Sequence, residues 1–533
     1  MPRLVHASTW VAGRDMVIGM RRLIAVVAGV LLALAGPAVA RAATAPAQFG
    51  TDWDDPRTAA PAVATPGTAS CSTTILEHAF DNYDVYQNAY RPVCRGPWAK
   101  VVLRLDGSVA GRQYDRLGWL TLGGVEIFKT STPEPSPDGI AWSVEKDVTG
   151  YSALLAEPQT VNMYLGNTVD DTYTGVLNVK VSLTFYAADR AHPAPRSASD
   201  VLPLAGAHAD GQDLAGTLTV PRNTERLLAE VYATGSGGGC EEFWYLTAPS
   251  ATGYSCPADP GPYREVQVLL DGKVAGIAAP FPHVYTGGWS NPYLWYVLPA
   301  PRAFDIKPLT YDLTPFLGSL TDGAAHTVAV HVVGVPAGQG GWDTPINFLG
   351  WRDPGVRRET GGLLGSRLGT LTNEVTTGSR NVVLHAAHTF TATGYLRTSH
   401  GLVTTSVRER VGNDSTHTWG DGENPDALTA TWTDDVTGVV TGPSGFAGVT
   451  RAADRYAIDG SLTVGADNRL TTTITMTDAG LGRDDTYRGQ ASYLQGVPRD
   501  QRQAVGTSQE RYRQGRYDRT IRTVNGFVVS APS

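Results

Sequence analysis

The stretch VLNVKVSLTFY, residues 176–186, carries the pattern that decides the fold class. Apolar and polar side chains alternate along it, with apolar ones at Leu177, Val179, Val181 and Leu183. A period of two predicts a β-strand that buries one face. Similar short runs, separated by turns, precede it at residues 100–105, 117–122 and 160–165. Together they predict an all-β domain.

The same pattern returns twice further along the chain. A second set of strands is predicted at 217–220, 226–233, 265–270, 293–298 and 327–333, with turns at Asp271-Gly272 and Asp322-Gly323. A third set is predicted at 382–392, 428–432 and 470–476. No period of about 20–50 residues repeats, which excludes propellers and solenoids.

Composition agrees with this class. Of the 533 residues, 42% are hydrophobic and 18% are charged, which is typical of globular proteins and excludes a wholly disordered chain. Sixty Gly, 34 Pro and 22 Tyr favour strands and turns over long helices. The formal net charge is −8, so we expect no basic groove and no nucleic-acid partner.

The N-terminus resembles a secretory signal peptide. Arg21 and Arg22 precede an apolar run at 23–35, and small residues suited to cleavage follow at 38–42. The run is shorter than the roughly 20 residues that span a bilayer, and no later segment qualifies. We therefore expect residues 1–43 to be removed and the mature protein to be secreted, without a membrane partner.

The chain is expected to divide into six parts. They are a signal peptide at 1–43, a flexible leader at 44–70, a β-sandwich at 71–187, a linker at 188–212, a second β-sandwich at 213–354 and a C-terminal β-rich region at 355–533.

Four cysteines, Cys71, Cys94, Cys240 and Cys256, form no C-x-x-C pair, which argues against a zinc ribbon or a thioredoxin-like site. Oxidising conditions outside the cell permit all three possible pairings. We favour bridges between neighbours, Cys71 with Cys94 and Cys240 with Cys256, because each then lies within one predicted domain.

Several common catalytic sites are excluded by inspection. There is no G-x-S-x-G, H-E-x-x-H, P-loop, G-x-G-x-x-G or EF-hand pattern. His385 and His388 are three residues apart on a predicted strand, so they should face opposite sides and make no metal pair. The glycine run at 235–239 is predicted to be a mobile loop. We expect no metal and no organic cofactor.

Carboxylates beside aromatic rings are the remaining candidates. In CEEFWY (240–245) a strand would place Glu242 and Trp244 on one face, about 6.6 Å apart. An indole packs on a sugar ring, and an apolar neighbourhood raises a carboxyl pKa towards the range of an acid/base catalyst. The alternative is a pair of solvated glutamates beside a core tryptophan.

Two further clusters have the same character. In YDRLGW (114–119), Asp115 and Trp119 share a predicted strand face and Arg116 is placed to pair with a carboxylate; the alternative is a solvated strand end. In YTGGWSNP (285–292), Trp289 tips a loop that would suit the rim of a ligand site, or an ordinary turn.

These clusters resemble the peptide-N-glycosidase A (PNGase A) family of glycoamidases. The resemblance covers roughly residues 75–350 and rests on YDRLGWLTLGGVEIFKTSTPEP (114–135), GIAWSVEKDVTGYSALL (139–155), NMYLGNTVDDTYTGV (162–176), EEFWY (241–245), REVQVLLDGKVAG (264–276), PFPHVYTGG (280–288) and YDLTPFLGSLTDGAAH (311–326). A fainter similarity reaches PNGase F. It implies two tandem antiparallel jelly-roll β-sandwiches with the active site at their interface.

The resemblance also implies an activity and its residues. The substrates would be N-linked glycopeptides or glycoproteins, hydrolysed at the amide between asparagine and the innermost N-acetylglucosamine to give aspartate and a glycosylamine. Asp115 and Glu242 match the two catalytic acids, and Asn167 stands where PNGase F has a further carboxylate. The expected substrate contacts are Arg116, Trp119, Glu241, Trp244, Trp289 and Asn167.

Three questions stay open at this point. A one-residue slip swaps the faces of a strand, so either Glu241 or Glu242 faces the cleft. The same sandwiches also suit a non-catalytic, lectin-like glycan-binding protein. An endo-glycosidase using Asp115 and Glu242 as its carboxyl pair is the rival among enzymes.

Overall fold

The computed structural model describes residues 57–135, 139–235, 240–285, 298–497, 501–525 and 527–531. The expected signal peptide, residues 236–239 of the glycine run, Trp289 and nearly all of the strand expected at 293–298 lie outside these residues. No helix among the described residues is long and apolar enough to cross a membrane.

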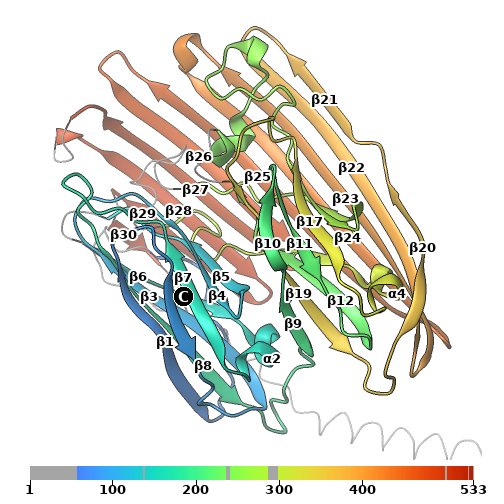
Figure 1. The fold of residues 1–533 in the computed structure, drawn as a ribbon. Coiled ribbons are helices and arrows are strands. Elements are labelled where there is room, and N and C mark those ends of the chain that lie inside the picture. The colour runs from blue at the N-terminus through green and yellow to red at the C-terminus, as the bar shows by residue number, and fades with distance from the viewer. Residues whose placement is uncertain are drawn as a thin grey trace, which may run out of the picture. The chain divides into compact units, whose positions relative to one another are not determined.

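The first domain is a jelly roll of two four-stranded antiparallel sheets, shown in blue and cyan in Figure 1. One sheet has the order β1 (Ser70–Phe80), β8 (Leu177–Ala187), β3 (Trp98–Val109), β6 (Ile140–Asp147). The other has the order β2 (Tyr86–Tyr90), β7 (Gln159–Leu165), β4 (Leu117–Leu122), β5 (Val125–Ser131). The strand orders 1-8-3-6 and 2-7-4-5 are those of a jelly roll.

Strand β8 confirms the alternation that predicted it. Its apolar side chains at Leu177, Val179, Val181 and Leu183 are all buried, whereas Asn178 and Lys180 between them are exposed. The strand pairs with β1 on one side and β3 on the other, so it lies inside its sheet. Two short helical turns, η1 (Thr149–Tyr151) and α2 (Ser152–Leu155), follow β6.

The second domain repeats the jelly-roll order. Its four-stranded sheet runs β16 (Leu309–Asp312), β12 (Thr224–Val231), β19 (Ile346–Arg352), β9 (Asp200–Pro203). Its five-stranded sheet runs β10 (Ala205–Asp210), β11 (Asp213–Leu218), β17 (His326–Val333), β14 (Glu265–Leu270), β15 (Lys273–Ala278). Smaller elements are β13 (Thr234–Gly235) paired with β18 (Trp342–Asp343), η2 (Glu241–Leu246), η3 (Ser250–Thr252), η4 (Thr314–Phe316) and α4 (Leu317–Leu320).

Strands β9 and β10 fall inside the segment expected to be a linker, 188–212. They belong to the second jelly roll because β9 pairs with β19 and β10 with β11. The turn expected at Asp271-Gly272 joins β14 to β15, with φ of 47° and 73°, the left-handed backbone that this hairpin turn requires.

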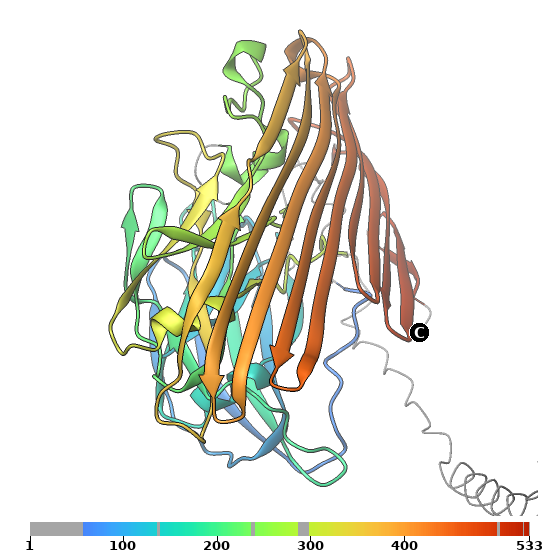
Figure 2. The same cartoon turned by 90° about the vertical axis from the view of Figure 1, so that its right-hand side faces the viewer.

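The C-terminal region forms one antiparallel sheet of eleven strands, coloured orange to red in Figures 1 and 2. The strands are β20 (Thr360–Leu368), β21 (Thr372–Thr377), β22 (Asn381–Thr398), β23 (Gly401–Trp419), β24 (Asp426–Gly442), β25 (Gly445–Val464), β26 (Arg469–Gly480), β27 (Arg483–Leu494), β28 (Val505–Gln514), β29 (Tyr517–Val524) and β30 (Phe527–Ser530). A turn, η5 (Asp421–Glu423), lies between β23 and β24. Burial alternates along β22, β23 and β26, so one face of this part of the sheet is covered.

The covered face of the long sheet is tied to the second jelly roll by polar contacts. Glu409 accepts a hydrogen bond from the Ile277 amide at 2.7 Å, and Asp434 accepts one from the Ala279 amide at 3.0 Å. The Arg302 guanidinium pairs with Asp478 at 2.7 Å. These buried contacts make the C-terminal region part of one packed unit with the sandwiches.

Part of the expected flexible leader is also held in place. The Ala59 amide donates to Glu510 of β28 at 2.9 Å, and the Val63 amide donates to Glu145 of β6 at 3.0 Å. The segment therefore connects the first sandwich with the long sheet.

Asp434, on the covered face of the long sheet, should make the stability of the protein depend on pH. Burial raises the pKa of Asp434 to about 7. Between about pH 4 and pH 7 the folded chain keeps a proton on Asp434 that the unfolded chain has lost. The contribution of this proton to the free energy of unfolding is complete below about pH 4 and is lost as the pH rises to about 7. In this window the free energy of unfolding falls by up to about 1.4 kcal/mol per pH unit. Asp434→Asn should flatten the dependence of Tm on pH across this window. Thermal unfolding at several pH values tests this, and an unchanged slope would contradict it.

Candidate active site

Asp115 lies in the loop that leads into β4, on the first jelly roll. The loop is fixed by its neighbours, because the Arg116 amide donates to Thr132 Oγ1 at 2.9 Å and the Arg116 guanidinium donates to Gln113 Oε1. Gln113 is buried and donates to the Thr168 and Gly175 carbonyls at 2.8 and 3.1 Å. Asp115 itself is partly exposed, and these contacts fix the loop that carries it.

Glu242 lies in η2, on the second jelly roll. The strand expected at 240–245 is wrong, since residues 241–246 form a 3₁₀ turn that begins directly after Cys240. This turn packs closely on β13, because a Cβ atom at Gly235 would lie 2.2 Å from the Glu241 carbonyl oxygen. Glycine at 235 therefore permits the packing, and Glu242 remains partly exposed.

The structure brings Asp115 and Glu242 into one electrostatic cluster. The pKa of Asp115 is raised well above its usual value, first by burial and next by the negative charges of Glu242 and Glu134. Burial also raises the pKa of Glu242. The pKa of the Tyr285 hydroxyl is raised by burial and by both Glu242 and Asp115. The charge of Glu242, on the second jelly roll, thus acts on Asp115 of the first, and burial and this repulsion both favour retention of a proton by Asp115.

Glu134 is the member of this cluster that sequence reasoning missed. It lies in the TPEP segment directly after β5. This segment is part of the resemblance to the PNGase A family, but the resemblance assigned no role to Glu134. The one feature of the sequence that could have indicated Glu134 is its position as a single acidic residue after a strand, β5, all of whose residues are buried.

The structure distinguishes Glu241 from Glu242. Glu241 is fully buried, and both of its oxygens are bound by Arg264 at 2.6 and 2.8 Å. The Trp342 indole donates to the same carboxylate at 2.6 Å. Glu241 is thereby committed to holding η2, and Glu242 faces the carboxyl cluster.

The other expected substrate contacts have different surroundings. Trp244 is 2% exposed and packs against Trp342 and Trp432, so it belongs to the core. Asn167 is also buried and donates to the Phe80 and Gly175 carbonyls, which gives it a structural role. In the described structure both side chains are enclosed by other protein atoms.

Trp119 keeps a partly exposed ring on the outer face of β4. It stacks on Tyr164 of β7, with ring centroids 5.7 Å apart and planes 21° apart. Trp119 lies four residues beyond Asp115, on the strand that the Asp115 loop enters, and its partly exposed ring is therefore near that loop in the chain.

Buried polar side chains also join the two jelly rolls at Lys129 and Asn347. Lys129 of β5 donates to the Tyr232 carbonyl at 2.9 Å and to Asp343 of β18 at 2.8 Å. Nearby, Asn347 of β19 exchanges two hydrogen bonds with the backbone of Glu126, whose pKa burial raises to about 8. The charge of Asp343 also acts on Tyr285, so this joint lies beside the carboxyl cluster.

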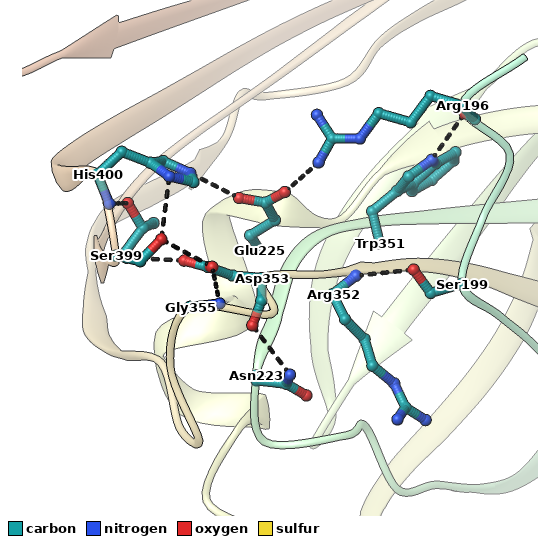
Figure 3. A network of polar contacts seen from close by, with 11 residues as sticks. Arg196, Ser199, Asn223, Glu225, Trp351, Arg352, Asp353, Gly355, Ser399 and His400 are labelled. Carbon is teal, nitrogen blue, oxygen red and sulfur yellow. Dashed lines mark hydrogen bonds and ion pairs between the residues drawn. The ribbon is translucent and has the colours of Figure 1, made fainter.

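The candidate site contains no described group of side chains spaced for a metal ion. Among the described residues, the one such group is Glu225 and Asp353 of the second jelly roll with His400 of the turn between β22 and β23 (Figure 3). His388 is buried against Glu265 whereas His385 is exposed, which confirms that the two histidines face opposite sides.

Comparison with known proteins assigns the family. Residues 56–347 match the family model of peptide N-acetyl-beta-D-glucosaminyl asparaginase amidase A. The chain belongs to this family. It is 32% identical over 381 residues to the peptide-N4-(N-acetyl-beta-glucosaminyl)asparagine amidase A of Prunus dulcis, an alignment that covers 64% of this chain and 66% of that protein. The chain thus spans slightly less than two-thirds of the curated relative.

Two solved structures are similar at lower identity. PNGase F, a glycosylasparaginase from Flavobacterium meningosepticum, aligns with 53% of this chain and 96% of its own, at 13% identity and a TM-score of 0.35. PNGF-II aligns with 53% of this chain and 66% of its own, at 14% identity and a TM-score of 0.34.

Both disulfides expected from the sequence are present in the family domain, Cys71–Cys94 and Cys240–Cys256. The second joins cysteines that are 16 residues apart, and its Cys240 directly precedes η2. Replacing Cys240 and Cys256 with serine should lower the free energy of unfolding by about 3 kcal/mol. It should also reduce the glycopeptide hydrolysis that family membership leads us to propose, because Glu242 loses its anchor.

The matched control is the pair Cys71→Ser and Cys94→Ser. It should cost similar stability without changing kcat at a temperature where both variants are folded. Equal losses of kcat in the two double variants, measured alongside denaturant unfolding, would show that the second bridge has no special connection to the site.

Proposed function

We propose that the protein is a secreted glycoamidase. It hydrolyses the amide between asparagine and the innermost N-acetylglucosamine of N-linked glycopeptides, and it gives aspartate and a glycosylamine. The observation that carries the proposal is the cluster of Asp115 and Glu242, contributed by two jelly rolls of a chain that belongs to the amidase A family. Two disulfides and the signal-like N-terminus support export.

The chemistry needs one proton acceptor and one proton donor. An amide carbonyl is a poor electrophile, so water must be aligned and deprotonated as its oxygen attacks the carbonyl carbon. The C–N bond then breaks, and the nitrogen leaves with a proton. In our proposal Asp115 orients the linkage and the attacking water, and Glu242 exchanges protons through water.

The raised pKa values support this division of labour. Burial raises the pKa of both carboxyls, and the charge of Glu242 raises the pKa of Asp115 further. Asp115 therefore holds a proton at higher pH than a free carboxyl does, and an acid and a base coexist. Arg116 offsets part of the negative charge, since its presence lowers the pKa of Asp115. Trp119, stacked on Tyr164, offers the sugar an aromatic face.

Product identity tests the proposal. The purified mature chain is incubated with a defined N-glycopeptide, and the products are analysed by mass spectrometry. Release of the intact glycan with aspartate left in the peptide supports the amidase. Asparagine that keeps one N-acetylglucosamine would establish an endo-glycosidase instead, and unchanged substrate with measurable glycan binding would establish a lectin-like protein.

A further inference from the structure

The covered face of the long sheet carries a row of large side chains that contact the second jelly roll. Trp432 of β24 pairs with Tyr456 of β25, and Tyr456 pairs with Asp478 of β26. Directly paired residues of neighbouring strands point to the same side of a sheet. All three side chains are buried. Trp432, Tyr456 and Asp478 therefore form one continuous row, the sheet row.

The sheet row supports the turn that carries Glu242. Trp244, two residues after Glu242 in η2, packs edge-on against Trp432, with ring centroids 5.6 Å apart and planes 74° apart. Both indoles are buried in a close-packed interior, so Trp244 keeps its place only while Trp432 keeps its own. The position of η2, and with it that of Glu242, depends on a residue of the C-terminal sheet.

The sheet row also supports the segment that leads to Tyr285. Phe281 contacts Tyr456 edge-on, with ring centroids 5.0 Å apart. The Arg302 guanidinium pairs with Asp478 at 2.7 Å and lies 4.3 Å from the centre of the Phe281 ring and 4.9 Å from that of the Tyr456 ring. A guanidinium over two aromatic faces is attracted to both rings and holds them together.

Two contacts join the supported segments to each other. The Tyr245 hydroxyl of η2 donates to the His283 carbonyl at 3.3 Å, and the His283 ring stacks on the Tyr285 ring with centroids 5.7 Å apart. All three side chains are buried. Glu242 and Tyr285 thus belong to one packed unit, and this unit contacts the sheet row at two places.

The first residue of β24 holds the same region from another point. Asp426 is buried and accepts a hydrogen bond from the Tyr254 hydroxyl at 2.8 Å. Tyr254 lies two residues before Cys256, whose disulfide partner Cys240 directly precedes η2. Strand β24 therefore holds η2 itself through its tryptophan and the disulfide loop through its aspartate.

We propose that Trp432 and Tyr456 are positioning residues of the active site, and that the C-terminal sheet forms the base on which the site is assembled. This inference rests on the proposed glycoamidase function. The sheet row lies beyond residues 56–347, which match the family model, so the family match assigns it no role. Both residues act through the aromatic side chains that they hold, without contact with the substrate.

The expected effect of disturbing the row is on turnover. Replacing Trp432 with a smaller side chain leaves volume into which Trp244 moves, and Glu242 in the same turn moves with it. A catalytic group displaced by about 1 Å can lose roughly 100-fold in rate. The ring of Trp119, on the first jelly roll, stacks on Tyr164 and keeps its place.

Trp432→Leu tests the proposal in the full chain. On an N-glycopeptide, kcat should fall by about 10–100-fold while KM changes little, because Glu242 serves proton exchange and not sugar binding. Trp432→Phe keeps an aromatic ring against Trp244 and should recover most of the lost kcat. Hydrogen exchange, followed by mass spectrometry, should become faster in the peptide that covers residues 241–248 of Trp432→Leu.

Ile521→Ala is the matched control. Ile521 is fully buried on β29, five strands from β24 in the order of the sheet, so this variant also removes volume from the covered face. It should lower Tm to a similar extent. At a temperature where all variants are folded, it should leave kcat and the exchange of residues 241–248 unchanged.

Two results would overturn the proposal. One is an unchanged kcat and exchange rate in Trp432→Leu. The other is an equal loss of kcat in Trp432→Leu and Ile521→Ala at equal loss of Tm, which would show general destabilisation.

The exchange measurement needs no activity, so it separates this proposal from the glycoamidase proposal. If the unmodified chain hydrolyses no glycopeptide, the glycoamidase proposal fails. Faster exchange of residues 241–248 in Trp432→Leu alone would then still support the sheet row as the support of η2, and unchanged exchange would overturn it.

Discussion

Asp115→Asn and Glu242→Gln should each lower kcat/KM on an N-glycopeptide by about 10²–10⁴-fold, the usual contribution of a general acid or base. Glu242→Gln removes the group that exchanges protons through water, and Asp115→Asn removes the carboxyl that orients the linkage and the water. Neither replacement changes side-chain volume much. Both carboxyls already have raised pKa values, so a neutral amide mimics their protonated form. At position 115 the amide also removes the repulsion by Glu242 and Glu134. Tm should therefore stay within a few degrees of the unmodified chain.

Steady-state kinetics and thermal unfolding of the same preparations check this expectation. Glu134→Gln is the informative companion, because Glu134 acts on Asp115 from a different segment. Removing its charge should lower the pKa of Asp115 and shift the pH–rate profile to lower pH, with a smaller loss of kcat. Full activity of both Asp115→Asn and Glu242→Gln would remove the site assignment.

Glu241→Gln should have the opposite character, with a loss of stability of about 3–5 kcal/mol. The glutamate is fully buried and binds Arg264 through both oxygens, so the amide leaves a buried guanidinium without its counter-charge. The Trp342 indole also loses a charged acceptor. Denaturant unfolding measures the change.

The neighbouring Glu242→Gln variant is its matched control, since the two residues are adjacent and undergo the same chemical change. We expect a stable, inactive Glu242 variant and an unstable Glu241 variant that keeps activity in proportion to the fraction folded. Interchanged results would mean that Glu241 is the acid facing the substrate.

Much of the fold follows from local patterns. The strands at 117–122 and 265–270 occur with the predicted bounds, because alternating or continuous apolar runs are bounded by turn residues. The long C-terminal strands were predicted only in fragments, such as 382–392 within β22. Their covered faces carry Glu409, Asp434 and Asp478, whose polar side chains interrupt the apolar period.

The site was less predictable than the fold. The run CEEFWY contains acids and aromatics in an order that fits a strand as well as a 3₁₀ turn, so the face of each glutamate depended on tertiary packing. Arg264, the partner that buries Glu241, lies 23 residues away, and nothing in the local sequence indicates the pairing. Glu134 likewise joins Asp115 only through the fold.

The most direct test of the central claim is hydrolysis of a defined N-glycopeptide in ¹⁸O-water, followed by mass spectrometry of the peptide. Direct attack of water on the amide carbonyl predicts that the new aspartate carries one heavy oxygen, and that Asp115→Asn and Glu242→Gln produce almost none of it. Aspartate without ¹⁸O, or glycan release that leaves asparagine in the peptide, would contradict the account.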